Sequence, residues 1–163
     1  MNPIASPGSR TARLGARPRS ELITPGFVLF GSALSGGVHL GLAPEHMAES
    51  EPLGVGFLAS GGLLVLLGVA TFVRPRSPRA PLALAFLLAG LIAAYALSRT
   101  AGLPLLHPEP EALDAIGLTT KGVELVALVL ALRLYVTNRS WLSPLPKQRS
   151  NKWTPISPAR RVG

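Results

Sequence analysis

Four long apolar blocks dominate this chain of 163 residues and constrain its fold more than any other feature. They run from about residue 24 to 43, 53 to 73, 80 to 98 and 115 to 136. Each block is close to the ~20 residues that cross a ~30 Å hydrocarbon core as an α-helix. The alternating pattern of transmembrane strands is absent. The blocks therefore predict an all-α membrane protein, a bundle of four antiparallel transmembrane helices.

The composition also favours a membrane protein. Only 15% of the residues are charged, whereas 48% are hydrophobic. Soluble domains carry roughly 25% charged residues, so this chain has too few to cover a surface that faces water. The sequence contains no cysteine, which excludes disulfides, thiolate metal sites, iron–sulfur clusters and cysteine nucleophiles.

Basic residues mark one side of the predicted bundle. Four arginines precede the first block, three lie in the turn 74–79, and seven Lys or Arg residues lie from residue 133 onward. Fourteen of the sixteen basic residues therefore share one side, and Arg99 and Lys121 are the exceptions. By the positive-inside rule that side is cytoplasmic. We predict a multi-pass plasma-membrane protein with its N-terminus and C-terminus inside.

The other charges follow this orientation. Acidic residues of the predicted outer side are Glu45, Glu49, Glu51, Glu109, Glu111 and Asp114. Because topology explains the basic residues, the formal net charge of +8 does not indicate nucleic-acid binding, although contact with the anionic lipid bilayer fits. We expect the basic segments 1–22 and 137–163 to be disordered tails. The first block resembles a signal peptide, but its length and Pro44 favour an uncleaved anchor.

Lys121 and Glu124 lie inside the fourth block, three residues apart and therefore on one helix face. Charged groups at such a depth usually face the interior of a bundle and are paired. His39 lies near the outer end of the first block and Arg99 at the outer end of the third. We predict that these four residues form a buried polar cluster. It is either an ion pair that fixes helix packing or a site for a ligand or proton.

A metal site near the outer face is a second hypothesis. His46 and Glu49 are three residues apart, with His39 nearby. Imidazole and carboxylate groups suit zinc, copper(II), nickel or iron, so we name these three as candidate ligands of a divalent transition metal. The alternative is a solvated acidic loop, because the sequence lacks an H-E-x-x-H motif. No resident cofactor is predicted, since a bis-histidine haem needs two histidines within the blocks and only His39 lies there.

Glycine positions indicate where helices pack closely. Gly37 and Gly41 form a G-x-x-x-G motif in the first block. The glycines of the second block are Gly54, Gly56, Gly61, Gly62 and Gly68. Small residues let helices approach each other in lipid. The pattern favours packing within one molecule, and a homo-oligomer or a membrane-protein partner is the alternative.

Three stretches carry a resemblance to a known family. They are His39-Leu-Gly-Leu-Ala-Pro44-Glu45-His46-x-x-Glu49, Ser98-Arg99-Thr100-Ala-Gly102-Leu103-Pro104 and Glu124-Leu. Over about residues 25 to 136 the chain resembles small four-span membrane proteins of actinobacteria. The resemblance implies a four-helix bundle in which these positions form a shared polar set, and it implies no activity. Family members usually carry an apolar residue at position 121, which directs attention to Glu124 with His39 or Arg99.

Three hypotheses about function follow from these patterns. The sequence has no P-loop and no G-x-S-x-G motif, and its short loops leave little room for a catalytic domain. We therefore predict that the chain is not an enzyme but a non-catalytic membrane component that acts through partner contacts. The main alternative is a protein that binds or transports a cation or proton at an outer His/Glu site. A membrane-embedded enzyme that uses the same groups is the third hypothesis.

Overall fold

A computed structural model describes residues 20–102 and 109–139 of the chain. The described part contains four helices and no strand: α1 (Ser20–Glu49), α2 (Glu51–Val73), α3 (Arg79–Thr100) and α4 (Ala115–Arg139). All four are long and apolar enough to cross a membrane, as the sequence predicted. The predicted tails lie outside the described residues, except for 20–22 and 137–139, which belong to α1 and α4.

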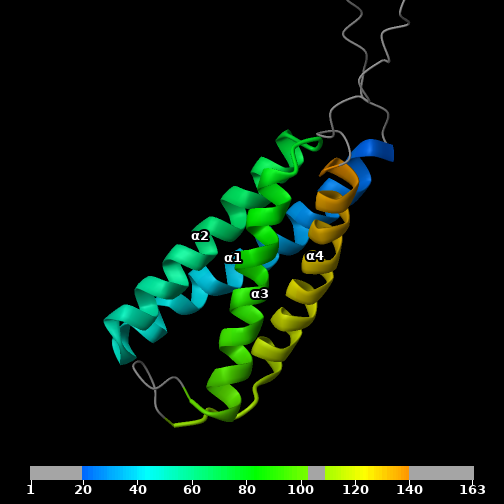
Figure 1. Cartoon of the computed structure of the whole chain (residues 1–163). Coiled ribbons are helices and arrows are strands. Elements are labelled where there is room, and N and C mark those ends of the chain that lie inside the picture. The colour runs from blue at the N-terminus through cyan, green and yellow to red at the C-terminus, as the bar shows by residue number, and fades with distance from the viewer. Residues whose placement is uncertain (1–19, 103–108, 140–163) are drawn as a thin grey trace, which may run out of the picture.

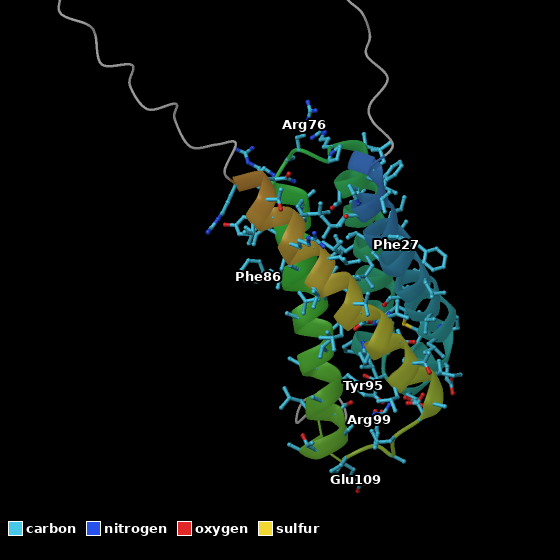
Figure 2. All side chains as sticks on the ribbon, turned by 90° about the vertical axis from the view of Figure 1, so that its right-hand side faces the viewer. Phe27, Arg76, Phe86, Tyr95, Arg99 and Glu109 are labelled. Carbon is cyan, nitrogen blue, oxygen red and sulfur yellow. The ribbon has the colours of Figure 1, made fainter. Side chains whose placement is uncertain are left out.

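The molecule has two distinct ends. Figure 1 shows the start of α1, the α2–α3 turn and the end of α4 together at one end. The α1–α2 junction, the end of α3 and the start of α4 lie at the other end. Figure 2 labels Arg76 at the first end and Glu109 at the second, so we call them the Arg76 end and the Glu109 end. Basic and acidic residues are thus concentrated at opposite ends of the bundle.

Helix α1 is longer than the sequence predicted. The first predicted block ended at about residue 43, directly before Pro44. Proline lacks an N–H group and commonly disrupts helices. Helix α1 instead continues through Pro44 to Glu49. Proline removes only its own hydrogen bond, and the next turn is intact, since Ser50 N donates to His46 O at 2.9 Å. Ser50 alone, with an extended backbone, separates α1 from α2.

Three glycines of α2 let this helix lie directly against α1. Gly54, Gly61 and Gly68 are seven residues apart, about two turns, and therefore share one face. A Cβ atom added to them would lie 2.5, 2.8 and 2.0 Å, respectively, from the nearest atom of α1. Gly36 on α1 is equally confined, because its added Cβ would lie 2.8 Å from Gly61 O. The two helices therefore lie close together, and backbone atoms are the nearest neighbours at Gly54, against Met47, and at Gly36, against Gly61.

The bundle buries polar side chains and exposes apolar ones. The buried polar residues are Ser32, Ser35, His39, Ser60, Thr71, Ser98, Thr120, Glu124 and Asn138. The apolar core consists of Val28, Leu64, Leu84, Ala85, Leu88, Ala127 and Ala131. Large apolar side chains such as Phe27 and Phe86 point outward, 62% and 73% exposed (Figure 2). Soluble monomers rarely expose apolar surface on this scale, whereas helices that face lipid require it.

A side-chain contact closes the Arg76 end of the bundle. Asn138, near the end of α4, is buried, and its Nδ2 donates a hydrogen bond of 2.7 Å to the carbonyl of Pro75. Pro75 lies in the turn between α2 and α3. The contact therefore joins the last turn of α4 to the connection of the other two helices.

The glycine packing gives a test of the α1–α2 interface. We expect Gly54→Ala and Gly61→Ala to lower the unfolding free energy by about 1–3 kcal/mol each, because the new methyl group overpacks the interface. An added Cβ at Gly56 or Gly62 has no atom within 4 Å. Gly56→Ala and Gly62→Ala are therefore matched controls. Unfolding in bicelles measures the difference, and equal effects at all four positions would contradict the packing described.

Candidate functional site

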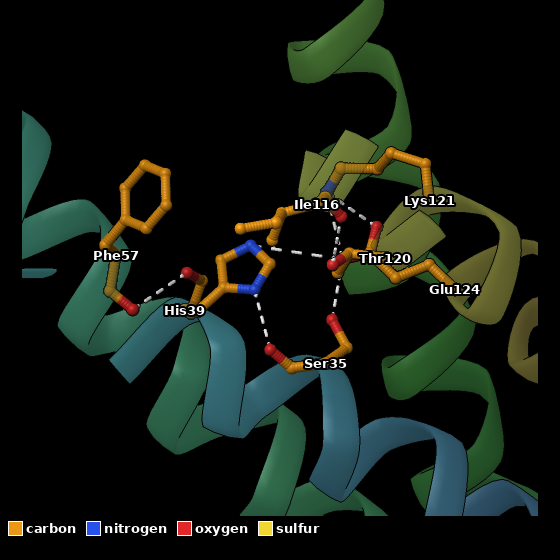
Figure 3. A network of polar contacts seen from close by, with 8 residues as sticks. Ser35, His39, Phe57, Ile116, Thr120, Lys121 and Glu124 are labelled. Atoms are coloured by element: carbon orange, nitrogen blue, oxygen red, sulfur yellow. Dashed lines mark hydrogen bonds and ion pairs between the residues drawn. The ribbon is translucent and has the colours of Figure 1, made fainter. Parts of the chain in front are cut away.

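Glu124 is the most constrained polar residue of the described structure. It lies on α4, and its side chain is 0% exposed. Lys121, on the preceding turn of α4, donates to both carboxylate oxygens, at 2.9 and 2.8 Å. From α1, Ser35 Oγ donates to Glu124 Oε1 at 2.6 Å (Figure 3). The carboxylate thus has three hydrogen bonds and joins α4 to α1.

His39 follows Ser35 by one turn of α1 and faces the same carboxylate. Its Nδ1 lies 2.9 Å from the backbone carbonyl oxygen of Ser35. A carbonyl oxygen can only accept a hydrogen bond, so Nδ1 carries a proton and donates it. Nε2 then points toward Glu124 Oε1, 3.9 Å away (Figure 3). We call Ser35, His39, Lys121 and Glu124 the α1–α4 cluster.

Burial determines how strongly the α1–α4 cluster is held. Glu124 is nine residues from the start of α4, about 14 Å along the helix axis. An unpaired carboxylate at this depth would be costly because no water solvates it. The Lys121 ammonium, 14% exposed on its side chain, supplies the opposite charge on the same helix face. The charges of Lys121 and Glu124 therefore neutralise each other within α4, and the hydrogen bond from Ser35 joins the pair to α1.

Arg99 was predicted to belong to the same cluster, and its ion pairs lie in the segment before α4 instead. Its guanidinium group binds the carboxylates of Glu111 and Asp114, at 2.8 Å each, and also donates to the carbonyl of Ala112. Asp114 Oδ1 in turn accepts a hydrogen bond of 2.5 Å from Gly117 N in the first turn of α4. Arg99 therefore fixes the segment that leads into α4.

Tyr95 of α3 lies between these two charged groups. The centre of its ring is 4.8 Å from the Arg99 guanidinium carbon and 5.6 Å from Lys121 Nζ. Cations at such distances from an aromatic ring are attracted to it. Figure 2 shows Tyr95 and Arg99 close together, toward the Glu109 end. Tyr95 thus links the Arg99 contacts to the α1–α4 cluster without a hydrogen bond between them.

The predicted metal ligands are not gathered at one point. His46 Nδ1 lies 3.3 Å from Glu49 Oε2, in a partly exposed pair on the last turn of α1. His39, seven residues earlier and about 10 Å away along the helix, faces Glu124 instead. Both imidazoles contact the ring of Phe57 on α2, with centroid distances of 5.2 Å for His39 and 4.0 Å for His46.

Within residues 20–102 and 109–139, no group of three or more His, Cys, Asp or Glu residues is arranged to hold a metal ion. A third histidine, His107, lies between the third and fourth blocks and outside this part of the chain. The chemistry of the donor set therefore does not identify a metal. Metal binding by His39, His46 and Glu49 stays a prediction.

Three residues of the site were missing from the sequence interpretation: Ser35, Phe57 and Tyr95. Serine is common in membrane helices, and its hydroxyl usually bonds its own backbone, as Ser60 Oγ does with the carbonyl of Phe57. One signal was present, because Ser35 precedes His39 by four residues and thus shares its helix face. Nothing in the sequence distinguished Phe57 or Tyr95 from ordinary packing residues.

Comparisons with protein-family models, with curated proteins and with solved structures show no match to this chain. The resemblance to small four-span proteins of actinobacteria therefore stays a prediction.

The ion pair of the α1–α4 cluster gives a stability prediction. Lys121→Met leaves the buried Glu124 carboxylate without its cation, and we expect the unfolding free energy to fall by about 3–5 kcal/mol. The double variant Lys121→Met/Glu124→Gln removes both charges and is expected to recover most of this loss. Unfolding in bicelles by steric trapping measures both values.

A matched control for this experiment lies on the same helix. Arg133 is exposed on α4, and Arg133→Met removes one positive charge without leaving a buried carboxylate unpaired. We expect it to change the unfolding free energy little. A Lys121→Met variant as stable as Arg133→Met would show that the buried pair does not stabilise the bundle.

Proposed function

We propose that this protein is a non-catalytic component of the plasma membrane that acts through contacts between its helices and a partner. The observation that carries the proposal is the outward face of α1. Gly37 and Gly41 are both exposed there, and a Cβ atom added to either would meet no atom within 4 Å. The adjacent Gly36 is confined by α2 instead.

The outward face of α1 is suited to another transmembrane helix. Leu34, Gly37 and Gly41 follow one another at helical spacing on this face, and the side chain of Leu34 is 47% exposed. Two glycines four residues apart allow a second backbone to approach closely. The partner is either a second copy of this chain or another membrane protein. The one-residue α1–α2 connection and the short α2–α3 turn add little structure outside the membrane.

The proposed orientation places the Arg76 end in the cytoplasm and the Glu109 end outside. Arg74, Arg76 and Arg79 all lie in or beside the α2–α3 turn. Glu111 and Asp114 lie at the opposite end, before α4. This distribution supports an antiparallel bundle with the N-terminus and the C-terminus inside.

The α1–α4 cluster favours a second candidate function, the binding or transport of a cation or proton. Ionisable groups inside membrane helices commonly serve ion or proton pathways. Here a fully buried carboxylate, Glu124, has an imidazole 3.9 Å away and an ammonium group on both oxygens.

The orientation can be tested with single cysteines, because the chain contains none of its own. We expect a membrane-impermeant maleimide to label Ala48→Cys and Ala112→Cys in intact cells. Ser77→Cys, in the α2–α3 turn, should react only after the cells are permeabilised. The reverse labelling pattern would overturn the proposed orientation.

The partner contact can be tested by photo-crosslinking from the outward face of α1. A photoreactive residue in place of Leu34 should give one discrete adduct in membranes, at twice the chain mass for a second copy. Gly37→Ile and Gly41→Ile should abolish this adduct, because the larger side chains prevent close approach.

The glycines of other helices provide matched controls for the crosslinking. Gly90 on α3 and Gly122 on α4 are also exposed, with no atom within 4 Å of an added Cβ. Gly90→Ile and Gly122→Ile should leave the adduct unchanged. An adduct that is insensitive to Gly37→Ile and Gly41→Ile, or the absence of any adduct, would refute the role of this face.

A further inference from the structure

The two atoms that face each other across the α1–α4 cluster are both hydrogen-bond acceptors. His39 Nδ1 donates to the Ser35 carbonyl, so the Nε2 atom of a neutral imidazole carries a lone pair. That lone pair is directed at Glu124 Oε1, 3.9 Å away. Glu124 Oε1 already accepts hydrogen bonds from Ser35 Oγ and Lys121 Nζ. The lone pair of His39 Nε2 is therefore the position in this pair that can take up a proton beside a carboxylate.

We infer that His39 and Glu124 form a binding site for an exchangeable proton, held on His39 Nε2. A hydronium ion gives up the proton by breaking one of its O–H bonds and leaves as water, while the proton adds to the lone pair and no bond of the protein breaks. The imidazolium then donates toward Glu124 Oε1, forming a charge-assisted hydrogen bond once the gap closes to about 2.8 Å. This inference rests on the second candidate function and is independent of the partner contact of α1.

The charged groups around His39 favour a proton over a metal ion. On α4 it faces the carboxylate of Glu124 and the ammonium of Lys121, which already occupies both carboxylate oxygens. A divalent ion would add two charges directly beside that ammonium. Coordination would also need further ligands, and no group of three is arranged for it among the described residues. A proton adds one charge and needs only the imidazole.

Among the described residues of α2 and α3, no further carboxylate contacts His39. On α2 its neighbour is the Phe57 ring, which also contacts His46 of α1. On α3, the Tyr95 ring contacts Lys121 of the cluster and also Arg99. The proton on His39 is thus balanced by Glu124 and opposed by Lys121. Uptake changes the charge of the cluster from neutral to +1 and strengthens the bond between α1 and α4.

Nitrogen-15 NMR of the full chain in lipid vesicles tests this directly. The chain has three histidines, and loss of one signal in His39→Gln assigns His39. Toward pH 8 we expect protonated Nδ1 and bare Nε2. Toward pH 5, across the range where imidazoles change charge, both nitrogens should become protonated, reversibly. A bare Nε2 throughout, or a proton on Nε2 instead of Nδ1 toward pH 8, would overturn the inference.

A charge-neutral variant tests the role of Glu124. In Lys121→Met/Glu124→Gln the side-chain amide at position 124 can donate to His39 Nε2, so His39 should lose its doubly protonated signal across the whole range. His46, which is paired with Glu49, serves as the internal control and should behave as in the original chain. Proton uptake by His39 that is unchanged in this variant would show that Glu124 has no part in the site.

Further outcomes distinguish the proton site from a metal site and from the partner contact of α1. Zinc that shifts the His39 signal at one equivalent would replace the proton with a metal ion as the ligand. Failure of the NMR prediction with an intact Leu34 crosslink would refute the proton site and leave the partner contact standing. Proton uptake by His39 without a Leu34 crosslink would support the proton site and refute the partner contact.

Discussion

The charge on Glu124 has to be balanced inside the bundle, and this requirement determines how α4 is placed. No water reaches a fully buried carboxylate, so its hydrogen bonds must come from neighbouring side chains. Lys121 supplies the charge from the same helix, and Ser35 supplies a hydroxyl from α1. Rotation of either helix by a fraction of a turn would break these bonds. The carboxylate therefore fixes both the rotation and the depth of α4 relative to α1.

The Arg99 contacts position the same helix from its other side. Arg99 holds Glu111 and Asp114 together, and Asp114 caps the first turn of α4. Tyr95 lies between Arg99 and Lys121 and contacts both. Residues of α3 therefore position both the start of α4 and its buried ion pair. The polar contacts of α4 are thus spread over α1, α3 and the α2–α3 turn, while the α1–α2 pair is held by glycine packing.

The thickness of a membrane makes four helices predictable from the sequence, because it requires apolar blocks of nearly constant length. The inward orientation of Lys121 and Glu124 is also predictable, because charged groups within a membrane helix usually face the interior of the bundle. The contacts of Arg99 were not, since they depend on how the chain between α3 and α4 folds back. Nor does a sequence tell Gly36, which touches α2, from Gly37, which faces outward. That distinction depends on helix rotation, which only the assembled contacts determine.

The link of one residue between α1 and α2 has a consequence for biogenesis. With only Ser50 between them, the end of α1 and the start of α2 are held at the same level of the bundle. In a bilayer the two helices would therefore act as one hairpin, closed by the glycine contacts. Because its backbone hydrogen bonds are satisfied within each helix, this hairpin can enter lipid as a unit. The hairpin then presents to α4 the face of α1 that carries Ser35, whose hydroxyl donates to the Glu124 carboxylate.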